Sequence, residues 1–336
     1  YDAQDPEWAD RDRFVLSAGH GSMLLYSLLH LTGYADMTMD EIKNFRQLGS
    51  KTAGHPEYGH ASGIETTTGP LGQGLAMAVG MALSERLTNA RFGDGLVDHH
   101  TYVIAGDGCL MEGVSHEAIS FAGHIGLDKL IVLFDDNAIS IDGGTGLSVS
   151  DDQMARFSAC GWDVSDVDGH DSAAISEAIE AAKQSDKPSM IACKTVIGYG
   201  APNKEGTSAT HGAPLGEEEI SAARVKLGWT AAPFHVPEDV LSAWRAAGAR
   251  GQAERAAWTE RLTVSDYQRD FTAAMAGDMP KGWMSALTDH KKALSEEAPG
   301  WATRKASGEA LEVLNKAIEE MVGGSADLTG SNNTMV

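Results

Sequence analysis

The sequence predicts an α/β fold, a doubly wound parallel sheet with helices on both faces. Short apolar runs recur through the middle of the chain, at residues 101–105, 130–134 and 189–194, and segments of helical character lie between them. Strands that alternate with helices in this way imply βαβ units and a parallel sheet that is covered on both sides. Hydrophobic residues make up 42% of the 336, which is enough for a sizeable core.

The predicted elements follow in a regular order. A strand, a turn and a helix are expected over residues 14–31, and after a polar loop a further helix at 74–87. Strands are then expected at 101–105, 130–134, 162–167 and 189–194. The helices around them are predicted at 114–124, 151–159, 171–184 and 217–227, the second capped by Ser150 or Asp151 and the third by Asp171. Crossovers between the strands should be right-handed.

The composition changes beyond the last of these helices. Prolines interrupt the chain at residues 233–237, and helical segments of mixed charge follow to about residue 300, as is typical of a connector. A new amphipathic helix is predicted at 303–321. We therefore expect three parts, residues 1–235, 236–300 and 301–336, of which the last begins a second α/β domain.

Charge and cysteine content exclude several classes of protein. Asp and Glu total 48 against 26 Lys and Arg, so the chain lacks the basic surface that nucleic-acid binding needs. No apolar run is long enough to span a membrane. The cysteines (Cys109, Cys160, Cys193) are too far apart for a disulfide framework or metal motif, which favours a reducing cytoplasm. Because the chain starts at Tyr1 and shows no signal peptide, we expect its start to be internal to a longer protein.

Two polar motifs follow neighbouring predicted strands. Gly106-Asp107-Gly108 comes directly after one strand, and Asp135-Asp136-Asn137 comes after the next. In open α/β sheets, ligands bind at the carboxyl ends of the strands. Glycines let the backbone approach an anion, and the carboxylate and amide oxygens suit Mg²⁺ or Ca²⁺ shared with phosphate oxygens. An ordinary turn is the alternative explanation of the first motif.

This pair of motifs resembles the metal and diphosphate motif of thiamine diphosphate enzymes. Longer strings narrow the resemblance to the transketolase family, and the likeness extends over almost the whole chain. The strings are RDRFVLSAGH (11–20), FRQLGSKTAGHPE (45–57), TTGPLGQG (67–74), GDGCLMEG (106–113), DDNAISIDG (135–143), HGAPLG (211–216), ATRKASG (302–308) and GGSADLTGSN (323–332).

The resemblance implies a cofactor site with defined residues. Asp107, Asn137 and the main-chain carbonyl of Ile139 would hold the metal, and Asn137 would also border the cofactor. The amide of Gly108 would contact the diphosphate. The residues implied at the aminopyrimidine region are Gly69, Pro70 and Leu71. Without the resemblance, the glycine turn at 69–74 is explained as well by packing or by an anion-binding helix start.

Histidines in glycine-containing loops form the second group of candidates. The resemblance implies that His20 and His211 are catalytic and face both diphosphate and substrate, while His55 binds the donor's hydroxyl groups. Imidazole suits proton transfer near neutral pH. A loop histidine that bonds only to backbone is the alternative for each. We expect His30 and the pair His99-His100 to be structural.

The last group lies near the carboxyl end. Arg304 and Ser331 would bind the phosphate of the sugar, because a guanidinium makes bidentate contacts to phosphate oxygens. Asp327 would approach the thiazolium cation from the second domain. The alternatives are a solvated arginine and an ordinary turn aspartate. The resemblance also implies that residues 1–235 are a diphosphate-binding domain without its amino end, that residues 236–300 are a helical connector, and that residues 301–336 are the start of a pyrimidine-binding domain.

The activity that the resemblance implies is transketolase activity, the reversible transfer of a two-carbon ketol unit between sugar phosphates such as xylulose 5-phosphate and ribose 5-phosphate. Transketolases act as homodimers, in the pentose phosphate pathway or the carbon-fixing cycle. Their catalytic glutamate and an amino-terminal Ser-Gly-His-Pro-Gly string lie outside this sequence, so this chain alone is expected to be inactive.

Three alternative functions remain at this stage: a dihydroxyacetone synthase, a deoxyxylulose-phosphate synthase-like enzyme, or a non-catalytic cofactor-binding module. A Rossmann dehydrogenase is disfavoured because no GxGxxG fingerprint follows the first strand.

Overall fold

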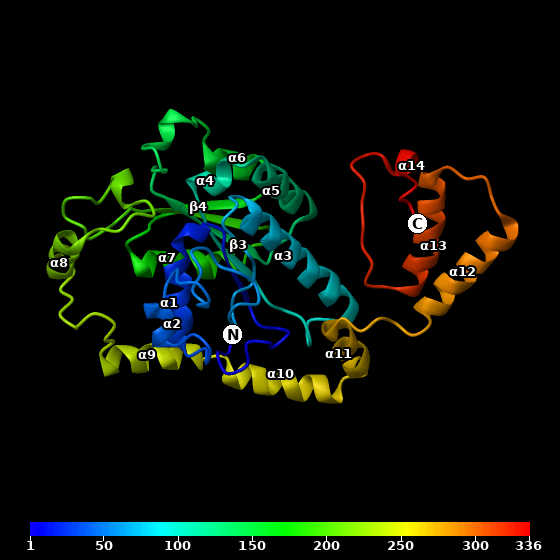
Figure 1. Cartoon of the computed structure of the whole chain (residues 1–336), viewed down its shortest axis with the longest axis horizontal. Helices are drawn as coiled ribbons and strands as arrows, with labels where there is room; N and C mark the ends of the chain where they lie inside the picture. The colour runs from blue at the N-terminus through cyan, green and yellow to red at the C-terminus, as the bar shows by residue number, and fades with distance from the viewer. The chain divides into compact units, whose positions relative to one another are not determined.

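The computed structural model describes residues 1–336, which form two compact units, Tyr1–Arg261 and Leu262–Val336. The first unit is built on one sheet of five parallel strands (Figure 1). In spatial order these are β1 (Arg13–Leu16), β2 (Thr101–Gly106), β3 (Leu130–Asp136), β5 (Ser189–Lys194) and β4 (Asp163–Asp168). The predicted parallel sheet is therefore confirmed.

Side chains that alternate along the strands form cores on the two faces of this sheet. Val103 and Val132, which are paired in register, point toward α3 (Gln73–Phe92) and α5 (Gly113–Ile125), and Phe157 of α6 (Gln153–Ala159) extends this core. All three strand and helix side chains named here are almost fully buried. This face carries the larger of the cores.

The opposite face is covered by other helices. Ile131 and Ile191 pack against α7 (Ser172–Ala182). Leu16 packs against α1 (Ser22–Thr32). Because α3, α5 and α6 cover one face and α1 and α7 the other, the sheet is doubly wound, as predicted (Figure 1).

Acidic side chains set the starts of two helices. Asp171 accepts hydrogen bonds from the amides of Ala173 and Ala174, at 2.9 and 3.1 Å, and so caps α7 as predicted. For α6 (Gln153–Ala159) the predicted cap is wrong: Asp152 takes this role by accepting from the amide of Ala155. Asp151 pairs with Arg156 instead, which removes it from the helix start.

The first unit contains further helical elements. Helix α4 was not expected from the sequence, because its five residues begin directly at the end of β2. The elements are η1 (Gly19–Gly21), α2 (Met39–Lys43), α4 (Asp107–Met111), η2 (Thr145–Leu147), η3 (Ser208–Thr210), α8 (Glu217–Lys226), α9 (Glu238–Gly248) and α10 (Gln252–Val264), whose end passes the unit boundary at Arg261.

The second unit consists of helices. They are α11 (Gln268–Ala276), α12 (Trp283–Glu297), α13 (Thr303–Ala317) and α14 (Thr329–Asn332), and α12 packs against α13. The boundary between the units falls inside the region 236–300 that we predicted to be a connector. The three-part division remains a prediction. In neither unit is any helix long and apolar enough to cross a membrane.

Candidate cofactor and metal site

The two polar motifs meet at the carboxyl edge of the sheet. Gly106 of β2 lies opposite Asp135 of β3, so the residues that follow these strands emerge side by side. Helix α4 starts at Asp107 immediately after β2, and the carboxylate of Asp107 accepts a hydrogen bond from the amide of Ala138. The sequence thus brings Asp107 into contact with the Asn137 segment through a shared sheet edge.

Among the carboxyl groups at this edge of the sheet, Asp107 has the most strongly shifted pKa. Its pKa is raised from the ordinary value of 3.8 to about 6, first because the group is desolvated and second because of the negative charges of Asp136 and Asp135. The Oδ2 atom of Asp107 is buried and has no hydrogen-bond partner. A desolvated carboxylate oxygen without a donor is suited to a bound cation, which would supply the missing positive charge.

Asn137 is held beside Asp107 by its neighbours. Its Nδ2 donates to Oδ2 of Asp135 at 2.9 Å, and its Oδ1 accepts from the amide of Ile139 at 3.0 Å. Asp135 in turn accepts a hydrogen bond from the hydroxyl of Thr195 at the end of β5. Since an amide oxygen has a second lone pair, Oδ1 of Asn137 retains the capacity to bind a metal.

This donor set fits a hard divalent cation. Asp107, Asn137 and the carbonyl of Ile139 offer oxygen ligands, which Mg²⁺ and Ca²⁺ prefer. The structure holds no group of three or more His, Cys, Asp or Glu side chains that could bind a metal ion. Sequence reasoning did not find the supporting roles of Asp135 and Thr195, because Thr195 lies far from the motif in the chain.

The glycine turn before α3 packs tightly against the first βα turn. Gly69 has φ +137°, and an added Cβ would lie 3.0 Å from Cγ of His55. On the other side, a Cβ on Gly19 would lie 2.7 Å from the amide nitrogen of Gly69. Leu71 reaches the GDG turn, since a Cβ on Gly108 would lie 3.0 Å from its Cδ1. The structure thus brings Gly69, Leu71 and Gly108 together at one edge.

The predicted loop histidines gather at the same edge. The rings of His20 and His211 are stacked, with centroids 4.5 Å apart and an interplanar angle of 20°. The pKa of His20 is lowered by desolvation and then by His211 and His55, while Asp135 opposes the shift. His20 is therefore held as a neutral imidazole, the form that can accept a proton. The Nδ1 atom of His211 is buried without a hydrogen-bond partner.

The histidines expected to be structural have local partners. Nδ1 of His30 lies 2.9 Å from the carbonyl of Met37, and Nδ1 of His99 lies 3.1 Å from a carboxylate oxygen of Asp10. His170, which sequence reasoning passed over, stacks on Tyr199 with ring centroids 4.1 Å apart. His170 follows β4 and Tyr199 follows β5, so this contact could have been predicted only from a sequence motif that links the two segments.

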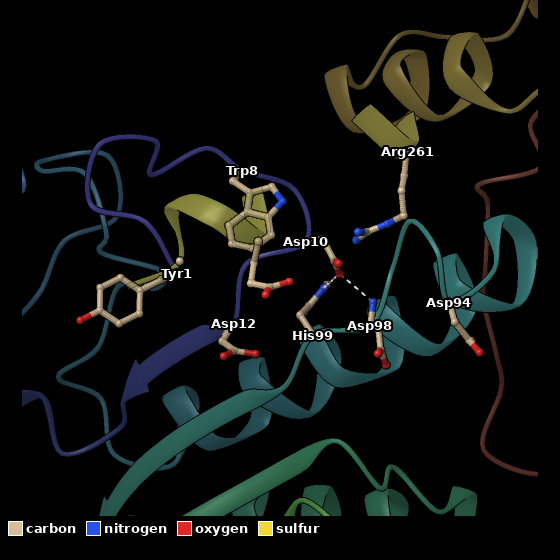
Figure 2. Close-up of a pocket in the computed structure, with 10 residues that line it drawn as sticks. Tyr1, Trp8, Asp10, Asp12, Asp94, Asp98, His99 and Arg261 are labelled. Atoms are coloured by element: carbon tan, nitrogen blue, oxygen red, sulfur yellow. Dashed lines mark hydrogen bonds and ion pairs between the residues drawn. The ribbon is translucent and has the colours of Figure 1, made fainter. Parts of the chain in front are cut away.

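A hollow of about 300 Å³ lies at the amino ends of β1 and β2 (Figure 2). Asp10 there accepts hydrogen bonds from the amide of Asp98 at 2.6 Å and from His99 at 3.1 Å. Asp12 and Arg261 also line it. It contains none of the predicted site residues and is at the amino end of β1 and β2, so it is separate from the cofactor site.

The predicted phosphate-binding residues are in the second unit. Arg304 at the start of α13 donates to the main-chain carbonyl of Ser331 at 3.4 Å, so these two residues do come together. Asp327 is in a turn with a positive φ of 56°. Their predicted contacts with substrate and cofactor remain predictions.

Sequence comparison identifies similar proteins. Over residues 1–284 the chain matches the family described as transketolase, thiamine diphosphate binding domain. A transketolase from Cereibacter sphaeroides is 62% identical over 333 residues, which is 99% of this chain and 50% of that protein. Transketolase 1 from Escherichia coli K12 is 51% identical over 345 residues, which is 100% of this chain and 52% of that protein. The chain thus spans about half the length of the curated relatives it matches.

Comparison with solved structures agrees. A transketolase from Leishmania mexicana has a TM-score of 0.92 and 46% identity, covering 100% of this chain and 50% of that one. A Pichia stipitis transketolase in complex with sedoheptulose 7-phosphate has a TM-score of 0.91 and 40% identity, with the same coverage. These likenesses confirm the predicted fold and the predicted resemblance.

Proposed function

This chain belongs to the transketolase family, and we propose that the protein containing it is a transketolase, which moves a two-carbon ketol unit reversibly from a ketose phosphate to an aldose phosphate. The observation that carries the proposal is the buried, unpartnered Oδ2 of Asp107 beside Asn137, inside a domain of the thiamine diphosphate-binding type. The stacked pair of His20 and His211 at the same sheet edge supports it.

We propose that Asp107, Asn137 and the carbonyl of Ile139 hold Mg²⁺ or Ca²⁺, and that this metal anchors the diphosphate of the cofactor. The amide of Gly108 would donate to the diphosphate, while Gly69, Pro70 and Leu71 would border the aminopyrimidine. Thiamine diphosphate, when bound, supplies the nucleophilic carbon and the electron sink that ketol transfer requires. The protein's task is to place it and to exclude water.

The histidines would act on the substrate. His20, kept neutral by desolvation and by its histidine neighbours, would accept a proton from a hydroxyl group of the donor at neutral pH. His211 would bind the same region of the substrate, and His55 would bind the donor's other hydroxyls. Arg304 and Ser331 would hold the phosphate, and Asp327 the cationic ring of the cofactor. Related transketolases in complex with sugar phosphates support this substrate class.

Further parts of the proposal concern the whole protein. We propose a homodimer with its active site at the subunit interface, a cytoplasmic location, and a role in the pentose phosphate pathway or the carbon-fixing cycle. The alternatives of a dihydroxyacetone synthase, a deoxyxylulose-phosphate synthase and a non-catalytic module gain no support from the comparisons, whose named relatives are transketolases.

A coupled spectrophotometric assay tests the proposal. The full-length protein should convert xylulose 5-phosphate and ribose 5-phosphate only when thiamine diphosphate and Mg²⁺ are both present, and residues 1–336 alone should show no turnover. Transfer to formaldehyde in preference to ribose 5-phosphate would instead indicate a dihydroxyacetone synthase. Tight cofactor binding without any transfer would indicate a non-catalytic module.

A further inference from the structure

The loop that carries His211 needs a support outside itself. We call residues 195–216, between β5 and α8, the His211 loop. Its only regular element is the three-residue η3. The amide of His211 donates to the carbonyl of Ser208 at 3.0 Å, but Nδ1 of its ring has no partner. The orientation of the ring therefore depends on the backbone that carries it and on its stack with His20.

Glu219, in the first turn of α8, forms two hydrogen bonds with this loop. One carboxylate oxygen accepts from the amide of Asn203 at 2.8 Å, and the other accepts from its Nδ2 at 2.9 Å. Glu219 is only 6% exposed. The hydrogen bonds from Asn203 lower the pKa of Glu219, so the carboxylate stays ionised at neutral pH and the bonds are charge-assisted.

Lys204, the residue after Asn203, connects this contact to the segment around His211. Nζ of Lys204 donates to the carbonyl of Leu215 at 2.7 Å, which closes residues 204–215 into a ring that contains His211. Thr210, which belongs to this ring, packs closely against Gly198 outside it, since a Cβ added to Gly198 would lie 2.6 Å from Cγ2 of Thr210. A shift of Asn203 would therefore be transmitted to the backbone next to His211.

A capping role alone does not account for Glu219. Acidic residues favour the start of a helix, but Glu217 and Glu218 lie in the same turn and are exposed. Only Glu219 is buried and directed at Asn203. Two well-aligned bonds to a residue in an otherwise irregular loop restrict that loop more than they stabilise the helix.

We propose that Glu219 is a positioning residue, which acts through Asn203 to hold His211 against His20 at the cofactor site. It does not touch the reacting atoms. The inference rests on the proposed function for the identity of the ligand, thiamine diphosphate, but not on turnover.

The experiment uses the full-length protein and measures thiamine diphosphate binding, with Mg²⁺, by isothermal titration calorimetry. Glu219→Ala removes both acceptors. Asn203→Asp sets two carboxylates against each other. The double variant Asn203→Asp with Glu219→Gln exchanges carboxylate and amide, so two hydrogen bonds and the total charge are restored. Glu218→Ala is the control, because it removes the same charge from the same turn at an exposed position.

We expect Glu219→Ala and Asn203→Asp each to raise the Kd for thiamine diphosphate by about 10-fold. This factor corresponds to about 1.4 kcal/mol of binding free energy, the size expected when hydrogen bonds that order the loop are lost. The double variant should return to within about 3-fold of the parent, and the control should stay within about 2-fold. Activity should follow the Kd, with kcat falling by up to about 100-fold because His211 is misplaced.

Two outcomes would overturn the inference. One is an unchanged Kd in Glu219→Ala at a temperature well below its Tm. The other is a Kd that rises equally in the single and double variants, which would assign Glu219 to fold stability alone. If the parent binds the cofactor and the variants follow the expected order, yet neither the parent nor any variant transfers a ketol unit, the proposed function fails and the positioning role stands.

Discussion

Replacement of Asp107 by asparagine should stabilise the metal-free protein while it destroys the cofactor site. In the absence of a metal, the carboxylate of Asp107 is desolvated and close to two other acidic groups. Asparagine has the same shape, still accepts from the amide of Ala138, and can donate to the neighbouring carboxylates. The charge that a cation would need is removed at the same time.

The magnitude follows from the raised pKa of Asp107. A rise from 3.8 to about 6 corresponds to about 3 kcal/mol against the ionised form. Because the group is only partly buried, solvent screening reduces this penalty to about 1 to 2 kcal/mol. Asp107 is protonated more readily in the folded state, so the penalty is absent below about pH 4, grows between about pH 4 and pH 6, and is complete above that range.

Thermal unfolding of the EDTA-treated full-length protein measures the effect. At pH 8, Asp107→Asn should raise the Tm by about 2 °C or more, and at pH 5 this advantage should fall by about half. In the presence of Mg²⁺ the Kd for thiamine diphosphate should rise by about 100-fold or more. A lower Tm for the metal-free variant at pH 8, or an unchanged Kd, would refute the assignment of Asp107.

Three other predictions test the packing and the electrostatics of the site. Gly74→Ala should lower the free energy of unfolding by about 1 to 3 kcal/mol, because the new Cβ would lie 2.6 Å from Cα of Ser17. Gly80→Ala is the control in the same helix: a Cβ there meets no atom within 4 Å, so chemical denaturation should show a free energy of unfolding higher by about 0.5 to 1 kcal/mol. His211→Asn should raise the pKa of His20, because the electrostatic effect of His211 is one of the causes that lower it; an unmoved pKa in an NMR titration of labelled histidine would contradict this. Thr195→Val should weaken metal-dependent cofactor binding by about 10-fold, because Asp135 loses a hydrogen bond and no longer fixes Asn137; unchanged binding would leave Thr195 without a role.

The strands, and the place of the two polar motifs at their ends, could be predicted because local patterns determine them. The runs at 101–105 and 130–134 are apolar enough to be buried in a sheet, and the two polar motifs follow them directly. The start of α4 at Asp107 could not be predicted, since nothing in Asp-Gly-Cys-Leu-Met distinguishes a helical turn from an ordinary one.

Long-range packing explains where the predictions fell short. Helix α3 continues to Phe92, beyond the predicted end at residue 87, because Phe92 is buried at the helix end. The stack of His20 on His211 joins residues far apart in the chain. Family resemblance indicated both histidines, but only the fold shows that they touch.

A crystal structure of the full-length protein with thiamine diphosphate and a divalent metal tests the central claim most directly. We predict one metal ion bound by Oδ2 of Asp107, Oδ1 of Asn137 and the carbonyl of Ile139, at about 2.0 to 2.1 Å for Mg²⁺ or about 2.3 to 2.6 Å for Ca²⁺. The diphosphate should lie beside Gly108. Cofactor bound at another place, or metal that leaves Oδ2 of Asp107 without a ligand contact, would contradict the account.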